Sequence, residues 1–113
     1  MTTIEETTLT IIAEETKLEG KLQLDHITRI HGTISGDIIA KKGSTVILCE
    51  TGVIEGNIQG DEVIIAGFIK GDISATSKIV LASSGRIIGN IKTPSLSLEH
   101  GAYFEGNSQM ESL

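Results

Sequence analysis

The sequence predicts an all-β protein, a single-domain β-solenoid of about six coils with three short strands in each coil. Three observations predict this fold. Ile, Val and Thr make up 35 of the 113 residues, and β-branched side chains favour pleated strands. Glycine occurs 13 times and proline once, as is typical of many short strands joined by turns. The third observation is a glycine-containing heptapeptide that recurs along the chain.

The heptapeptide has the form Gly-x-Ile-x-Gly-Asp/Asn-Ile. Complete copies begin at Gly32, Gly52, Gly67 and Gly85, and degenerate copies lie at 18–22 and 104–108. A period near 17 residues is too short for a helix pair or a propeller blade, and it suits one turn of a β-helix. The second glycines of the copies are Gly20, Gly36, Gly56, Gly71, Gly89 and Gly106.

The apolar residues of the repeat predict the core. The two isoleucines of a heptapeptide are four residues apart, so they face the same side of a strand. A second apolar pair, such as Val46 and Leu48, stands at alternate positions between heptapeptides and is also expected to face inward. Stacked coils place the isoleucines in two core columns, Ile34, Ile54, Ile69 and Ile87 in one and Ile38, Ile58, Ile73 and Ile91 in the other.

The Gly-Asp or Gly-Asn step inside each heptapeptide is expected to form a corner of the coil. Glycine accepts positive φ, and Asp and Asn tolerate left-handed angles and bond their own backbone. The corner glycines are therefore Gly36, Gly56, Gly71, Gly89 and Gly106. The solenoid domain is expected over residues 10–108, with a flexible tail at 1–9 and a short tail at 109–113.

Composition and charge argue against several classes of protein. The net charge of −6 disfavours a nucleic-acid partner, because phosphates require a basic surface. No apolar run approaches the length of a membrane span, and the N-terminus lacks the pattern of a signal peptide. The single Cys49 fits a reducing compartment, so a cytoplasmic location is expected.

No set of residues points to catalysis, a cofactor or a metal. His26, His31 and His100 occupy no common repeat position and lack metal-ligand spacing. Asp37 and Asp72 stand at matching corners, but the calcium-binding Gly-Gly-x-Gly-x-Asp nonapeptide is absent. We therefore expect a protein that is not an enzyme and that uses no cofactor.

The pattern does not match two other classes of solenoid. An ice-binding solenoid requires a column of threonines, which the outward positions Thr33, Val53 and Phe68 do not form. A left-handed β-helix acyltransferase requires an aliphatic residue at every sixth position, and counting by sixes from Ile34 reaches Lys70. An acyltransferase-like enzyme and a monomeric solenoid binding module are the alternatives to a structural polymer.

The segment from Thr10 to Met110 resembles the bactofilin domain. Residues 10–22 are similar to the first coil of that family, the heptapeptides to its central coils, and residues 101–110 to its closing coil. The resemblance implies a right-handed β-helix that assembles end to end into nucleotide-independent filaments. It also implies a bacterial cytoskeletal scaffold that localises cell-wall enzymes and influences cell shape.

The resemblance implies the partners as well. The main partner is the chain itself, as a homopolymer, and others are cell-wall enzymes or proteins of the inner membrane, at its cytoplasmic face. Many bactofilins carry a longer N-terminal membrane-targeting tail and a Pro-rich or basic C-terminal tail. Neither is visible in this sequence, so direct membrane binding is not expected.

The two ends of the solenoid are the predicted polymerisation interface. Each end presents unpaired backbone groups and the last apolar residues of the core columns, which favour pairing with another chain. Leu9, Ile11 and Ile12 are the candidates at the N-terminal end. Tyr103 and Phe104 are the candidates at the C-terminal end, because aromatic residues are enriched in interfaces. The alternative for these two aromatics is that they fill the end of the core.

Overall fold

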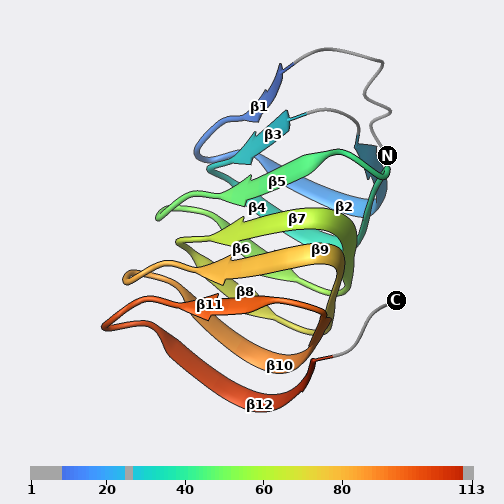
Figure 1. Cartoon of the computed structure of the whole chain (residues 1–113). Coiled ribbons are helices and arrows are strands. Elements are labelled where there is room, and N and C mark those ends of the chain that lie inside the picture. The colour runs from blue at the N-terminus through green and yellow to red at the C-terminus, as the bar shows by residue number, and fades with distance from the viewer. Residues whose placement is uncertain (1–8, 25–26, 111–113) are drawn as a thin grey trace.

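The computed structural model describes residues 9–24 and 27–110, and it describes side chains for residues 12–23 and 27–109 (Figure 1). In this part of the chain there is no helix, and the strands pair in parallel within one 12-stranded sheet that winds into a solenoid. The predicted all-β solenoid is therefore confirmed. The strands are β1 (Leu9–Ile12), β2 (Lys17–Leu24), β3 (Ile27–Ile30), β4 (Thr33–Ala40), β5 (Thr45–Leu48), β6 (Val53–Glu55), β7 (Ile58–Ile65), β8 (Phe68–Lys70), β9 (Ile73–Leu81), β10 (Arg86–Thr93), β11 (Leu96–Leu98) and β12 (Tyr103–Met110).

Parallel pairing arranges the strands in stacks along the rod. β1, β3, β5, β7, β9 and β11 form the odd stack, and β2, β4, β6, β8, β10 and β12 form the even stack. The longer strands bend at a corner and continue into a third side, where Ile38, Ile58, Ile73 and Ile91 pair in turn. Five register steps lead from Lys17 in β2 to Tyr103 in β12, so the chain makes about five turns.

The core consists of aliphatic columns that run along the rod. Ile34, Ile54, Ile69 and Ile87 are in register, and none of them exposes any surface. The isoleucines of the third side are at most 1% exposed. Further buried columns come from the odd stack, and burial of all these methyl groups is the main favourable term for folding. The odd-stack columns are Ile12, Ile30, Leu48, Ile65 and Leu81, and Val46, Val63 and Ile79.

The corner between the even stack and the third side is a ladder of stacked glycines. Their φ angles lie between 108° and 146°, a region that other residues rarely adopt. A Cβ on Gly71 would overlap the carbonyl oxygen of Gly56, and a Cβ on Gly89 would overlap that of Gly71. Both the conformation and the close approach of neighbouring coils therefore require glycine here. The ladder comprises Gly20, Gly36, Gly56, Gly71, Gly89 and Gly106.

The Asp and Asn residues that follow the corner glycines connect neighbouring coils. The Oδ1 atom of Asp72 accepts hydrogen bonds from the backbone N–H of Asn90 (3.3 Å) and from its Nδ2 (3.2 Å). Asp72 in turn donates its backbone N–H to Oδ1 of Asn57 at 3.4 Å. Asn57 and Asp72 thus accept backbone N–H groups of the next coil at this exposed corner.

Asp61 joins three successive coils at the opposite end of the third side. Its Oδ2 atom accepts the backbone N–H of Gly43 at 2.7 Å, and its Oδ1 atom accepts the hydroxyl groups of Thr76 and Ser77 at 2.5 Å. The hydrogen bonds from Ser77, Thr76 and Gly43, together with the charge of Lys42, hold the pKa of Asp61 below its ordinary value of 3.8. Asp61 thereby fixes the turn at 41–44, which follows β4.

The glycine ladder predicts opposite effects for two Gly→Ala substitutions. Gly71→Ala should lower the free energy of unfolding by at least about 2 kcal/mol, because of positive φ and the overlap with Gly56. Gly60→Ala is the matched control. Its Cβ would lie 3.5 Å from Cβ of Ala40 and from Cγ2 of Val63, which is ordinary contact. It should raise the free energy of unfolding by about 0.5 kcal/mol or more, since alanine restricts the unfolded chain. Urea unfolding measures both free energies. Equal losses of stability in the two variants would contradict the requirement for glycine in the ladder.

The lowered pKa of Asp61 predicts a pH-dependent contribution to stability. The ionised carboxylate stabilises the fold above the unfolded-state pKa, and this contribution is lost as the pH falls through the lower folded-state pKa. Asp61→Asn should therefore lower the melting temperature at neutral pH, and the difference from wild type should shrink below about pH 4. Thermal unfolding of both proteins between neutral pH and about pH 3 tests this. A difference that stays constant with pH would be inconsistent with an ionised Asp61 as the cause.

Candidate assembly surfaces

The C-terminal end of the rod is an open and partly apolar surface. β11 pairs with β9 and β12 pairs with β10, so within the described residues the other edges of β11 and β12 carry no strand. Leu98 is the last member of a buried column and is 53% exposed. Phe104 is the last member of the column that contains Ile87, and it is only partly covered by the core against which it packs. This end therefore offers apolar side chains beside free backbone donors and acceptors.

Among the described side chains, the apolar part of this end is confined to the side of the odd and even stacks. On the third side, Ser108 follows Ile91 in the core column, so the aliphatic column stops one coil before the end. Residues 105–109 are exposed, and they include Glu105, Asn107 and Gln109. A contact at this end would therefore bury Leu98 and Phe104 at its centre and leave polar groups at its rim.

The structure separates the two aromatic residues of the last coil. Adjacent residues of a strand point to opposite faces. Phe104 is in register with the buried Ile87, whereas Tyr103 is in register with the exposed Arg86 and is 49% exposed. Phe104 thus belongs to the end surface, and Tyr103 lies on the outer side of the rod at the rim of that end.

At the N-terminal end, the described side chains are mostly buried or charged. Ile12 is in register with Ile30 and is only 4% exposed, so it is a core residue. The backbones of Leu9 and Ile11 pair with β3, but their side chains lie outside the described residues. β2 carries Lys17, Glu19 and Lys21 at exposed positions, and Leu18 between them packs partly on the core. Residues 1–8 of the predicted tail also lie outside the described part of the chain.

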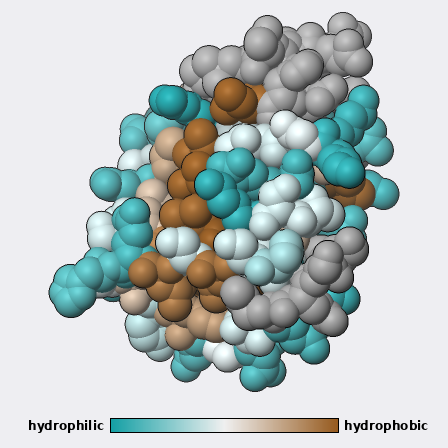
Figure 2. All heavy atoms as spheres, viewed as in Figure 1, coloured by the Kyte–Doolittle hydropathy of each residue, from teal (hydrophilic) through white to brown (hydrophobic). Residues whose placement is uncertain are grey.

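The odd stack carries an apolar stripe on its outer face that the sequence interpretation missed. Ile47, Ile64 and Val80 are in register on three successive coils and are partly exposed. A brown stripe runs along the rod over these strands in Figure 2. The signal was present in the sequence, because each of these residues stands between two inward apolar residues, and alternation directs the middle one outward.

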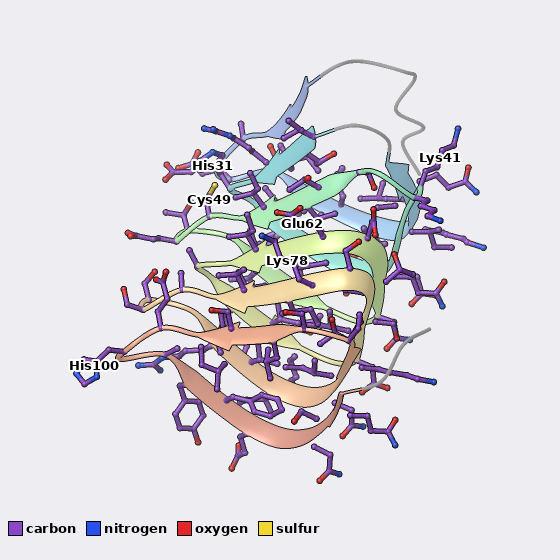
Figure 3. The ribbon with its side chains drawn as sticks, viewed as in Figure 1. His31, Lys41, Cys49, Glu62, Lys78 and His100 are labelled. Atoms are coloured by element: carbon purple, nitrogen blue, oxygen red, sulfur yellow. The ribbon has the colours of Figure 1, made fainter. Side chains whose placement is uncertain are left out.

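The histidines, the cysteine and the acidic residues of the described chain are scattered along the rod. No group of three or more His, Cys, Asp or Glu among these residues could hold a metal ion. His31 and Cys49 lie on neighbouring coils, and His100 projects from a turn at the other end of the rod (Figure 3). His26 lies outside the described residues. No helix suited to crossing a membrane occurs in the described chain.

Comparison with known proteins gives consistent matches over almost the whole chain. A family model named Bactofilin and described as polymer-forming cytoskeletal matches residues 10–109. Bactofilin BacO of Myxococcus xanthus is 33% identical over 102 residues, which cover 90% of this chain and 79% of BacO. Bactofilin BacP of the same organism is 28% identical over 101 residues, which cover 89% of this chain and 41% of BacP. No solved structure gives a significant match.

Proposed function

Because this chain belongs to the bactofilin family of polymer-forming cytoskeletal proteins, we propose that it assembles end to end into nucleotide-independent filaments. The filaments would act as a scaffold at the cytoplasmic face of the inner membrane and organise the machinery of the cell wall and cell shape. The observation that carries the proposal is the open C-terminal end, where the exposed Leu98 lies on a strand without an outer neighbour.

End-to-end contact would extend the solenoid. A strand of a second copy that pairs with the free edge of β12 would satisfy its backbone groups and continue the register of the even stack. The same contact would bury Leu98 and the exposed part of Phe104. Complete burial of a leucine side chain is worth about 1.5–3 kcal/mol. The apolar side chains of this end and the free backbone edge of β12 therefore both favour an end-to-end contact.

The outer surface of the even stack is poorly suited to such a contact. Glu55, Lys70 and Arg86 are exposed on its central coils, and burying these charges without partners would cost free energy. These polar faces remain accessible in an end-to-end filament. Any weak client site on them would be repeated once per subunit, and repetition raises the total binding strength. We propose cell-wall enzymes or inner-membrane proteins as such clients.

The end-to-end proposal predicts that Leu98→Arg prevents filament formation. The substitution places a charge at the centre of the contact, and the half-exposed position should tolerate it without unfolding. The critical concentration for assembly should rise at least about tenfold, with an unchanged β-sheet circular dichroism spectrum. Phe104→Arg should act in the same direction. High-speed sedimentation and negative-stain microscopy measure the effect.

Gln59→Arg is the control for these two variants. Gln59 is exposed on the third side in the middle of the rod, and its strand partners are Ile39 and Ser74, so arginine there meets no like charge from them. Glu55→Arg is less suitable, because it would stand beside Lys70. Filaments of Leu98→Arg and Phe104→Arg at the wild-type critical concentration would contradict the end-to-end contact. If the chain were instead an enzyme or a monomeric binding module, the wild-type protein would form no filaments at any concentration.

Assembly is also expected to need neither nucleotide nor divalent metal. The sequence has no Gly-rich loop that ends in Lys-Ser or Lys-Thr to hold phosphates. Purified protein treated with a nucleotidase and dialysed against EDTA should form filaments at the same critical concentration as untreated protein. Light scattering that rises only after addition of ATP, GTP or Mg²⁺ would refute this part of the proposal.

A further inference from the structure

The outer face of the odd stack has an apolar centre over three coils. Ile47, Ile64 and Val80 form its middle column. A second column lies two residues further along the chain, just past the end of each strand, where the backbone N–H groups of Cys49, Ala66 and Ala82 bond the preceding coil at 2.7–2.9 Å. Cys49, Ala66 and Ala82 alternate with buried residues, so they face outward, and they are partly exposed. We call these six residues the apolar face.

Charged residues lie beyond the two ends of the apolar face and differ in sign. In the middle column, Arg29 precedes Ile47 and Ser97 follows Val80. In the second column, Glu99 follows Ala82, and its carboxylate accepts the backbone N–H of Ser83 at 3.2 Å. Arg29 and Glu99 are both exposed. The face is thus positive toward the N-terminal end of the rod and negative toward the C-terminal end.

We propose that the apolar face binds the same face of a second copy in antiparallel orientation and thereby joins neighbouring filaments side by side. This proposal rests on the proposed function, since it concerns filaments that the end contacts have already formed. A two-fold axis across the rods at the level of Ile64 would bring the two apolar faces together. Ile64 would then face its own copy, and Ile47 would face Val80 of the second chain.

The charges favour the antiparallel over the parallel orientation. In the antiparallel pair, Arg29 faces Ser97 and lies beside Glu99 of the second copy, so opposite charges meet at both ends of the contact. In a parallel pair, each Arg29 would face the other Arg29, and like charges in a contact are unfavourable. Glu62 faces its own copy in the antiparallel pair, but each Glu62 is paired with Lys78 at 3.6 Å, and the two lysines flank the two carboxylates.

The size of the face indicates that it acts between filaments rather than between single subunits. With the flanking coils that carry Arg29 and Glu99, the contact would span five coils about 4.8 Å apart. A width of about four residues, each about 3.4 Å along the chain, then gives a contact on the order of 300 Å² per partner. Stable pairs of proteins bury about 800 Å² per partner. A single contact is therefore weak, whereas filaments aligned side by side would make one contact per subunit and gain from repetition.

Ile64→Lys tests the lateral contact without disturbing the ends. Wild-type filaments should pair or bundle, so they sediment at low speed and appear laterally associated in negative stain. Ile64→Lys should form single filaments that sediment only at high speed, because it places two lysines against each other on the two-fold axis. Gln59→Lys, on the same strand β7 but on the third side, should bundle like wild type. Bundles of Ile64→Lys, or wild-type filaments that never associate, would overturn the proposal.

Charge reversal tests the orientation. Arg29→Glu and Glu99→Arg should each remove most of the low-speed pellet, and the double variant should restore it. A double variant that stays unbundled would exclude the antiparallel pair. If wild type formed no filaments at all, the end-to-end function would fail. The face would then be tested by sedimentation velocity at high concentration, where Ile64→Lys must abolish a wild-type dimer. A dimer that persists in Ile64→Lys, or no dimer in wild type, would overturn the lateral proposal.

Discussion

The close approach of neighbouring backbones at the glycine corner is the constraint on which the rest of the fold depends. From Gly36 onward, each corner glycine lies so close to the carbonyl oxygen of the corner glycine in the preceding coil that no side chain fits between them. The corner therefore fixes the position of every coil relative to the one before it. Once the corners are fixed, the isoleucines on either side of each glycine fall into register and close the core. Each copy of the heptapeptide thus supplies two glycines at corners of its coil and two isoleucines in the core.

Variation in coil length is absorbed away from this corner. Between the odd and even stacks, the connection has two residues at 31–32 and 66–67 and four at 13–16, 49–52, 82–85 and 99–102. The four-residue turns close with backbone hydrogen bonds of 2.8–3.3 Å. On the third side, the turn at 41–44 is held by Asp61 of the next coil. Because these insertions lie outside the stacked strands, coils of unequal length share one core. The outer faces of the coils are then free to differ.

The fold was largely predictable from the sequence, because the period of the repeat and the alternation of Ile, Val and Leu report directly on stacking and burial. The residues of the candidate assembly surfaces were less predictable from the sequence. Tyr103 and Phe104 were grouped by chemical type, although alternation along β12 sends them to different faces. Ile12 was expected at an end surface, but β3 and the core cover it. The hydrogen bonds of Asp61 and Asp72 join residues 15 to 18 positions apart, and one-coil spacing alone does not reveal which side chains meet.

The parallel register between successive coils also has a consequence for folding kinetics. Every strand pair in the described chain joins segments that are one coil apart, 15 to 20 residues in sequence. Loop closure over such a span costs little entropy, and no pairing waits for distant parts of the chain to meet. A nucleus of two central coils can therefore grow in both directions, as in other solenoids. The outermost coils, with one neighbour each, would order last and exchange their amide hydrogens first.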